Sequence, residues 1–256
     1  MQHDPRDESE VVLRARAWRD AVHRAVCDVI EPWEHGTVVR ATRYPSYYDF
    51  NVVRVEDDPG MSVEALSAFA DEALAGLAHR RIDFDLVGAA DARRAAFDAA
   101  GWSAMRLLWL RHSGAAPEDP AIAVREVPYD DVHALRVQWM GEHDLPEVDP
   151  PGYHEQAREV ALRKGAQVLA VRDSGAVVAF AQLERDGAAA EVTQVYVDPA
   201  FRGRGLGTAL TCAAIRAAGE VGDLWICADD EDRAKDLYAR LGFRPAWLAM
   251  EFTRVP

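Results

Sequence analysis

Residues 191–218 constrain this chain more than any other stretch, because they read as a strand, a glycine-rich turn and a helix in direct succession. A β-branched and aromatic run from Val192 to Val197 predicts a strand, and Pro199 ends it because proline has no N–H for a ladder. Glycines then remove side chains from the turn, so that backbone N–H groups can approach a ligand. The helix that follows directs its unpaired N–H groups and positive dipole end at the same turn, which predicts a phosphate site.

Three phosphate-binding patterns compete for this turn. A Walker loop requires a lysine after its last glycine, and none follows Gly207. A Rossmann fingerprint is met at Gly203 and Gly205, but Thr208 holds its third glycine position and too few residues follow for the rest of the sheet. The third pattern, Arg-x-x-Gly-x-Gly, is complete from Arg202 onward. A glycine turn without a ligand is the remaining alternative, which the two arginines of the turn disfavour.

With this third pattern the chain resembles the GCN5-related N-acetyltransferase (GNAT) superfamily, whose acyl-CoA pyrophosphate loop lies between the fourth strand and the next helix. The resemblance implies that the turn binds the pyrophosphate, and that backbone groups of the strand hold the pantetheine arm and polarise the thioester carbonyl. The residues implied in cofactor binding are Val195, Tyr196, Val197, Arg202, Gly203, Arg204, Gly205, Leu206, Gly207 and Thr208. Acetyl-CoA is then the cosubstrate. No metal is expected, because the eight histidines show no ligand spacing.

A second motif, Leu-Tyr-Ala-Arg-Leu-Gly-Phe, occupies residues 237–243. Its periodicity predicts a helix that Gly242 ends, followed by a strand. The motif is similar to the second signature of the same superfamily, in which the tyrosine protonates the leaving CoA thiolate. This resemblance implies that Tyr238 is the general acid, and a phenol with a pKa of about 10 suits a thiol with a pKa of about 8.5. The other interpretation of Tyr238 is a core tyrosine that holds the helix in place.

The acceptor amine must lose a proton before it attacks, so a base is also expected. Glu191, on the strand before the turn, is the first candidate, with Asp229 and Glu184 as reserves. A strand glutamate that faces solvent is the alternative interpretation of Glu191. The chain departs from the family at Glu231, where many relatives carry an asparagine that contacts the cofactor. No role is therefore carried over to Glu231.

The sequence also indicates an internal repeat, in which both halves of the chain have a similar order of elements. Residues 114–121, which include two prolines, predict a linker. Residues 122–256 give the order strand, two helices, three strands, helix, strand, helix and strand, which the resemblance implies for one complete GNAT domain. Residues 1–113 follow a similar order when Gly101 is aligned with Gly242. We therefore expect an α/β (α+β) fold of two tandem acyl-CoA N-acyltransferase folds, each a mixed, mostly antiparallel sheet flanked by helices.

The N-terminal copy lacks the chemistry of the C-terminal one. In place of the arginine and glycine turn, residues 56–62 carry three carboxylates that would repel a pyrophosphate. Phe97 stands at the position of Tyr238 and has no proton to give. The first half is thus expected to be a degenerate GNAT-like domain that does not load acyl-CoA. Chance similarity between two α/β units is the alternative to this repeat.

The composition of the chain limits the expected classes of binding partner and the expected cellular location. A formal net charge of −14 argues against nucleic acid and suits a cationic amine, although solubility alone also explains it. No apolar run is long enough to span a membrane, and the acidic first eight residues do not resemble a signal peptide. Three scattered cysteines predict a reduced, cytoplasmic protein.

Two classes of function follow from these observations. The first is an N-acetyltransferase that moves an acetyl group from acetyl-CoA to a small-molecule or peptide amine by direct attack in a ternary complex. The second is a CoA-binding pseudoenzyme or regulatory module without transferase activity. Tyr238 favours the enzyme and Glu231 leans towards the second class. No nucleic-acid or membrane partner is expected, and a homodimer is left open.

Overall fold

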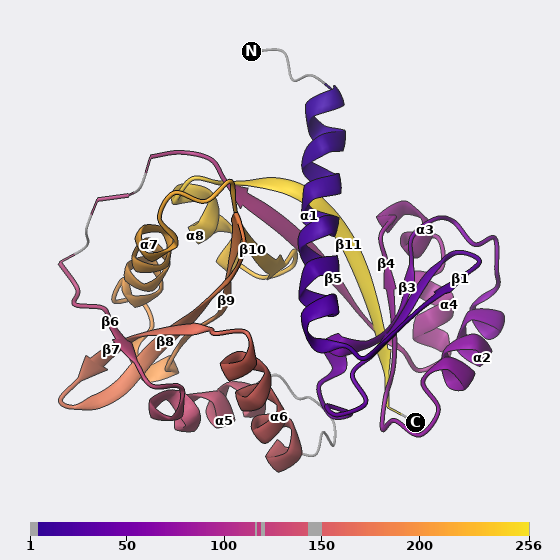
Figure 1. Cartoon of the computed structure of the whole chain (residues 1–256), viewed down its shortest axis with the longest axis horizontal. Helices are drawn as coiled ribbons and strands as arrows, with labels where there is room; N and C mark the ends of the chain where they lie inside the picture. The colour runs from indigo at the N-terminus through magenta and orange to yellow at the C-terminus, as the bar shows by residue number, and fades with distance from the viewer. Residues whose placement is uncertain (1–4, 116, 119–120, 143–149, 256) are drawn as a thin grey trace. The chain divides into compact units, whose positions relative to one another are not determined.

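The computed structural model describes residues 5–115, 117–118, 121–142 and 150–255. The chain divides into two compact units, which can be followed by colour in Figure 1. The N-terminal unit contains Met1–Trp109 together with Asp229–Glu231 and Ala246–Pro256. The C-terminal unit contains Leu110–Ala228 and Asp232–Pro245.

The C-terminal unit has the strand order β6-β7-β8-β9-β10. These strands are β6 (Arg125–Val127), β7 (Gln167–Asp173), β8 (Ala176–Asp186), β9 (Ala189–Val197) and β10 (Asp223–Asp229). Neighbours run antiparallel except β9 and β10, which are parallel because α7 (Leu206–Ala218) carries the chain back between them. Strands β7 and β8 form a hairpin, with Asp173 opposite Ala176 at its end.

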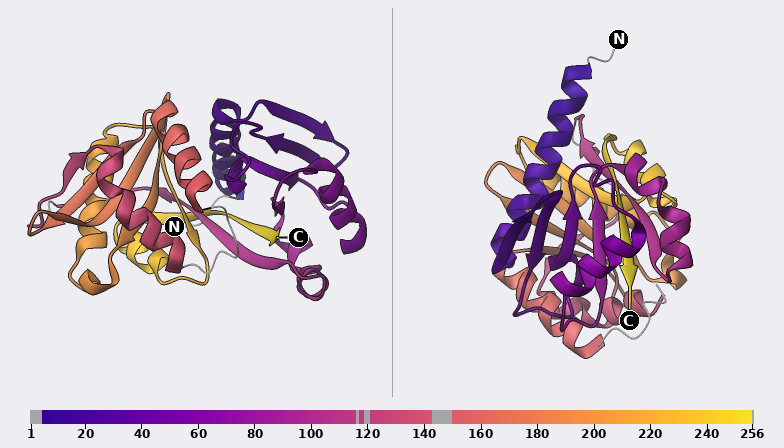
Figure 2. Two further views of the ribbon diagram at one scale, coloured as in Figure 1. Left: turned by 90° about the horizontal axis from the view of Figure 1, so that it is seen from below. Right: turned by 90° about the vertical axis from the view of Figure 1, so that its right-hand side faces the viewer.

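Helices cover both faces of this sheet. The α7 helix packs against β7, β8 and β9, while α5 (His133–Glu142) and α6 (Pro150–Arg163) lie on the other face, as Figures 1 and 2 show. A short 3-10 turn, η2 (Tyr129–Val132), leads into α5, and α8 (Ala234–Arg240) follows β10. The core beside α5 and α6 consists of Tyr129, Val132, Leu135, Ala161, Val168, Ala170, Phe180 and Tyr196. Strand β9 therefore lies between two helical layers and leads directly into the predicted binding turn.

The N-terminal unit repeats this order of elements after a long first helix, α1 (Pro5–Val26). Its further elements are β1 (Val29–Trp33), β2 (Gly36–Arg40), η1 (Tyr48–Phe50), β3 (Asn51–Val55), α2 (Val63–Ala73), β4 (Arg80–Phe84), α3 (Val87–Asp91) and α4 (Arg94–Ala99). Strands β1, β2 and β3 are antiparallel, and β3 is parallel to β4 across α2. The C-terminal unit arranges β7, β8, β9, α7 and β10 in the same way. The shared topology confirms the expected fold class.

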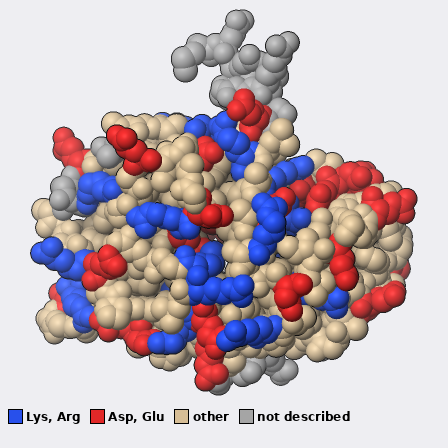
Figure 3. Space-filling view, viewed as in Figure 1, with Lys and Arg blue, Asp and Glu red and all other residues tan. Residues whose placement is uncertain are grey.

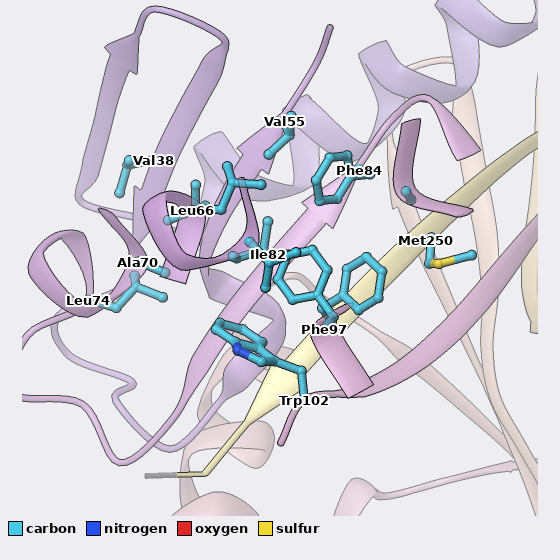
Figure 4. Packing of buried hydrophobic residues seen from close by; sticks show 14 residues of the cluster. Val38, Val55, Leu66, Ala70, Leu74, Ile82, Phe84, Phe97, Trp102 and Met250 are labelled. Carbon is cyan, nitrogen blue, oxygen red and sulfur yellow. The ribbon is translucent and has the colours of Figure 1, made fainter. Parts of the chain in front are cut away.

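Two long strands, β5 (Ser103–His112) and β11 (Phe243–Arg254), contribute residues to both units. From Ala246 onward β11 belongs to the N-terminal unit, where it pairs antiparallel with β4. Phe252 of this segment is fully buried, and its ring stacks on Phe97 with centroids 4.0 Å apart. Met250 joins the same core, together with Trp102, as Figure 4 shows. The N-terminal core is thus completed by the end of the chain.

This division differs from the boundary expected at residues 114–121, which assigned everything from 122 to 256 to the second domain. The physical reason is the length of β11, which has twelve residues and pairs with β4 from Met250 to Arg254. Its far end instead provides the apolar side chains that cover Phe84 and Phe97. Residues 116, 119 and 120 of the expected linker lie outside the described residues.

Charged side chains are distributed rather than gathered on the face drawn in Figure 3, where acidic and basic groups are interspersed. Several form ion pairs within one unit, such as Arg106 with Asp91 at 2.8 Å and Arg158 with Asp130 at 2.5 Å. Within the described ranges, no helix is both long and apolar enough to cross a membrane.

Phe252→Ala should destabilise the N-terminal unit, although the residue lies near the end of the chain. A buried Phe→Ala substitution typically costs about 3–5 kcal/mol, because it removes apolar contact and leaves a cavity. Hydrogen exchange followed by mass spectrometry should show faster exchange in residues 51–55 and 80–84 than in β7 and β8. Leu13→Ala, at a side chain that is 61% exposed, is the control. Equal acceleration in both units would contradict this assignment of β11.

Candidate functional site: the end of β9 and the turn into α7

The parallel pairing of β9 with β10 stops before either strand ends. The paired residues run from Ala189 opposite Asp223 to Val192 opposite Ile226. Strand β9 continues to Val197 and β10 to Asp229. Beyond the last pair, the backbone edges of the two strands no longer bond to each other, so polar groups of β9 are available to another partner.

A bulge lies just past this point, at Gln194. The register of β9 against β8 shifts between Phe180 and Gln182, as a β-bulge requires. Gln194 has a φ of 51°, in the left-handed region that residues other than glycine rarely adopt. Such a conformation costs of order 1 kcal/mol or more and persists only where its surroundings hold it. Nothing in the sequence predicted this bulge, because no glycine or proline marks it.

The turn after β9 has the geometry of an anion site. Gly203 and Gly205 have φ values of 76° and 80°, which a side chain would strain. Gly205 is the N-cap residue of α7, and no side chain caps the helix there. The N–H groups of the first turn of a 13-residue helix are therefore open to a ligand, at the positive end of the helix dipole. Leu206, Gly207 and Thr208, which are among the residues expected to bind the cofactor, form this first turn.

The two arginines of the turn play different parts. The Arg202 guanidinium donates to Glu142 Oε2 at 2.6 Å, and its Nε donates to the Val197 carbonyl at 3.0 Å. The Arg204 guanidinium donates to the Ala200 carbonyl at 3.2 Å, so its positive charge lies beside the turn. Arg202 thus fastens the turn to β9 and to the end of α5, and its charge is compensated by Glu142.

Glu142 is a site residue that sequence reasoning missed. Its Oε1 accepts a hydrogen bond of 2.5 Å from the Tyr196 hydroxyl, while its other oxygen accepts from Arg202. Burial raises the pKa of Tyr196, and the adjacent Glu142 carboxylate raises it further. No local sequence signal pointed to Glu142, because its partners Tyr196 and Arg202 lie 54 and 60 positions away.

Tyr238 is placed on α8, beside the start of α7. Its side chain is 6% exposed, and burial, followed by the charge of Asp232 and by Cys227, raises the pKa of its phenol. The neighbouring Leu237 lies 3.7 Å from the position that a Cβ on Gly207 would take, so α8 and α7 pack closely at the turn. A phenol with a raised pKa stays protonated at neutral pH, as a proton donor must.

The three candidates for the base have different environments. Glu191 is half-buried and lies opposite Trp225 of β10, one residue before the two strands part. Glu184 is 6% exposed, and its oxygens accept from Gln182 and Lys164. Asp229 Oδ1 accepts from the Glu231 backbone at 2.8 Å. Glu184 is thus held in a buried network, whereas Glu191 lies nearest to the parting of the strands along β9.

The N-terminal unit has no equivalent of this site among its described residues. Its β3 and β4 stay paired up to Val55 opposite Phe84, and the Asp85 N–H then donates to the Val55 carbonyl at 2.9 Å. Ser62 caps α2 by accepting from the Ala65 N–H at 3.2 Å. In the N-terminal unit, β3 and β4 therefore stay paired at the position where β9 and β10 separate in the C-terminal unit. The start of α2 has a side-chain cap, whereas the start of α7 has none.

The other positions of the N-terminal copy agree with this contrast. Phe97 is fully buried in the N-terminal core. In the segment before α2, Asp58 Oδ1 accepts from the Gly60 N–H and from Arg93, and these bonds lower the pKa of Asp58. Glu231 pairs with Arg94 of the same unit at 3.3 Å. No group of His, Cys, Asp and Glu in the described ranges is arranged to hold a metal ion.

Residues 131–243 match the model of the acetyltransferase (GNAT) family. An uncharacterized N-acetyltransferase of Methanocaldococcus jannaschii is 41% identical over 70 residues, which are 24% of this chain and 30% of that protein. A mycothiol acetyltransferase of Clavibacter sepedonicus is 38% identical over 94 residues, which are 35% of this chain and 31% of that protein. The matches therefore span less than a third of each relative's own length.

Solved structures share the fold at lower identity. A functionally unknown conserved protein from Staphylococcus epidermidis has a TM-score of 0.68 at 14% identity, covering 90% of this chain and 94% of that one. A GCN5-related N-acetyltransferase from Sphaerobacter thermophilus has a TM-score of 0.51 at 15% identity, covering 86% of this chain and 77% of that one. The region that matches the GNAT family model, residues 131–243, contains the bulge, the turn and the tyrosine helix.

Proposed function

We propose that the protein is an N-acetyltransferase that moves an acetyl group from acetyl-CoA to an amine by direct attack in a ternary complex. The observation that carries this proposal is the uncapped start of α7, reached through left-handed glycines from a strand that has parted from its neighbour. The match of residues 131–243 to the GNAT family model supports the transferase class. The name of the relative from Clavibacter sepedonicus supports acetyl as the transferred group.

Residues of the turn would bind the cofactor through charge and backbone groups. The N–H groups of residues 203–208 suit the pyrophosphate, and Arg204 adds positive charge beside them. Arg202 would shape the turn rather than bind the pyrophosphate directly, because its guanidinium already contacts Glu142 and Val197. Backbone groups of residues 195–197 would hold the pantetheine arm and polarise the thioester carbonyl.

Proton transfers complete the proposed chemistry. The amine nitrogen attacks the thioester carbon, the carbon–sulfur bond breaks, and its electron pair passes to sulfur. Tyr238 donates a proton to that thiolate, and the raised pKa of its phenol keeps the proton in place until then. The proton lost by the amine passes to Glu191, directly or through water. Glu191 then releases its proton to solvent and Tyr238 takes one up from solvent, so that both residues are restored.

The N-terminal unit would take no part in acyl-CoA binding. Its paired β3 and β4, its capped α2 and the carboxylates of residues 56–58 each oppose a pyrophosphate. We therefore assign it as a degenerate copy of the same fold. The acceptor is a small-molecule or peptide amine, and the net charge of −14 favours a cationic one.

Acetyl transfer itself is tested by a panel of amines that includes polyamines, aminosugars and peptides with free N-termini. Each is mixed with the purified protein and acetyl-CoA, and free thiol is measured as it forms. Thiol release that depends on one class of amine is the expected result. Tight CoA binding without amine-dependent thiol release would instead favour the CoA-binding pseudoenzyme.

One CoA should bind per chain, and Gly205→Asp should weaken that binding by at least about tenfold, or ~1.4 kcal/mol. The aspartate would place a negative charge where the pyrophosphate is expected. Gly165→Asp is the matched control, since Gly165 is also left-handed, with a φ of 62°, but lies at the turn between α6 and β7. Titration calorimetry gives both the affinity and the stoichiometry. Two CoA sites per chain would overturn the assignment of the N-terminal unit.

Tyr238→Phe should lower kcat by about 10²- to 10⁴-fold, the usual value of a positioned proton donor. The ring is retained, so the melting temperature and CoA affinity should barely move. Tyr129→Phe is the control, because Tyr129 is another buried tyrosine of the same unit. Near-full turnover of Tyr238→Phe on a verified amine would show that water protonates the thiolate and that Tyr238 is structural.

A further inference from the structure

The GNAT family site explains the turn, but it leaves a buried arginine on α5 without a purpose. We propose that Arg136 is a positioning residue for acetyl transfer, which holds Gln194 in its left-handed conformation and so fixes the course of β9 through Val195. This inference rests on the proposed function for its catalytic consequence. Its structural part, the control of the bulge by Arg136, stands on contacts within the C-terminal unit.

A chain of hydrogen bonds joins Arg136 to the bulge and to the sheet. The guanidinium donates through Nη1 to the Gln194 side-chain oxygen and through Nη2 to Gln182 Oε1 at 2.6 Å. The amide of Gln182 donates in turn to Glu184 Oε1 at 2.6 Å, and Glu184 also accepts from Lys164. The network therefore links β8, β9 and α5 to the residue that follows α6.

Arg136 is a costly residue to bury, since its side chain carries a charge and the residue is 3% exposed. Its guanidinium lies 4.2 Å from the centre of the Tyr129 ring and 5.0 Å from that of Phe180, which favours the cation in the absence of water. Packing alone does not require such an arrangement, because apolar residues of similar volume often stabilise a core as well or better. The arginine supplies what an apolar residue lacks, namely two directed donors for two glutamine oxygens.

One of those glutamines carries the strain of the bulge. Gln194 has a φ of 51° and follows the last pair of β9 and β10 by two residues. Rotation of Gln194 to an ordinary extended conformation would change the direction of the peptide groups at Val195 and beyond. Those groups are the ones proposed to hold the thioester, so the left-handed state must be retained for them to be aimed correctly.

The same helix holds β9 on the other side of Val195. Glu142, at the end of α5, accepts from the Tyr196 hydroxyl at 2.5 Å. Arg136 and Glu142 thus secure the residues immediately before and after Val195 from a single helix. Two fixed points on a rigid element leave the intervening peptide little freedom, as a preorganised site requires.

Gln194→Gly separates positioning from folding. Glycine adopts a positive φ without strain, so the melting temperature should change little, but the contact with Arg136 is lost. We expect kcat to fall about 10- to 100-fold, while the KM for acetyl-CoA stays within about twofold, because a small misplacement of reacting groups is costly. Gln194→Glu, which still accepts from Arg136, should restore most of the lost turnover. Arg158→Met, which removes an exposed ion pair on α6, should leave kcat unchanged.

A measurement that does not depend on activity accompanies the kinetics. Backbone amides of residues 194–197 should exchange with solvent at least about tenfold faster in Gln194→Gly and in Arg136→Met, with little change in residues 167–171. Unchanged exchange at 194–197 in both variants overturns the proposal, as does a kcat of Gln194→Gly within twofold of the wild type or one that Gln194→Glu does not improve. If the wild-type protein transfers no acetyl group, the proposed function fails, and the exchange rates alone decide whether Arg136 controls the bulge.

Discussion

The candidate site depends on the residue pair at which β9 and β10 stop bonding to each other. Up to the pair of Val192 and Ile226, the two strands form a parallel ladder, in which Trp225 is fully buried. Past that pair, the edge of β9 must find other partners or remain open to a ligand. The bulge at Gln194, the turn at Gly203 and Gly205 and the start of α7 all follow within a few residues. The end of this ladder therefore leaves a strand edge, and the uncapped start of α7 follows it along the chain.

The N-terminal unit shows what the same topology does without that termination. Its parallel pair β3 and β4 is bonded to the end, and one further bond from Asp85 extends it. A serine cap then satisfies the start of α2. These are small local differences, yet they remove the open strand edge and the open helix terminus together. A shared topology therefore does not imply a shared site, because a site depends on a few local groups.

The core of the N-terminal unit includes residues from the end of β11. Phe84, Phe97 and Phe252 form one aromatic cluster, and Phe252 comes from the strand that starts beside the tyrosine helix. The N-terminal core cannot be completed before residues 246–254 are made. Arg81 and Glu251, both largely buried, pair across the same two strands. This ion pair is buried, and a shift in the register between β4 and β11 would break it.

Sequence reasoning was strongest where the physical signal is local. Glycines at 203 and 205 predicted a turn without side chains, and both residues adopt the left-handed backbone that glycine permits. The run of β-branched and aromatic residues predicted β9, and the periodic apolar residues around Tyr238 predicted α8. The match of residues 131–243 to the GNAT family model likewise rests on contiguous motifs. The roles proposed for Tyr238, Glu191 and the turn remain predictions.

Other features required the tertiary structure, because they join residues far apart in the chain. Arg136 and Gln194 are 58 positions apart, and Glu142 and Arg202 are 60 apart, so no local pattern connects them. From the sequence, Arg202 was expected to bind a phosphate. In the fold, its guanidinium also contacts the Val197 carbonyl and Glu142 at the end of α5. The sequence also did not show that β11 from Ala246 onward belongs to the N-terminal unit, since the pattern of an apolar strand is the same whichever sheet it joins. The sequence by itself determined the elements and the glycine turn through local backbone preferences, and the match of residues 131–243 to the GNAT family model through contiguous motifs. Only the tertiary structure decided which distant side chains hold the site and which unit the last strand completes, because those contacts form when the sheets assemble.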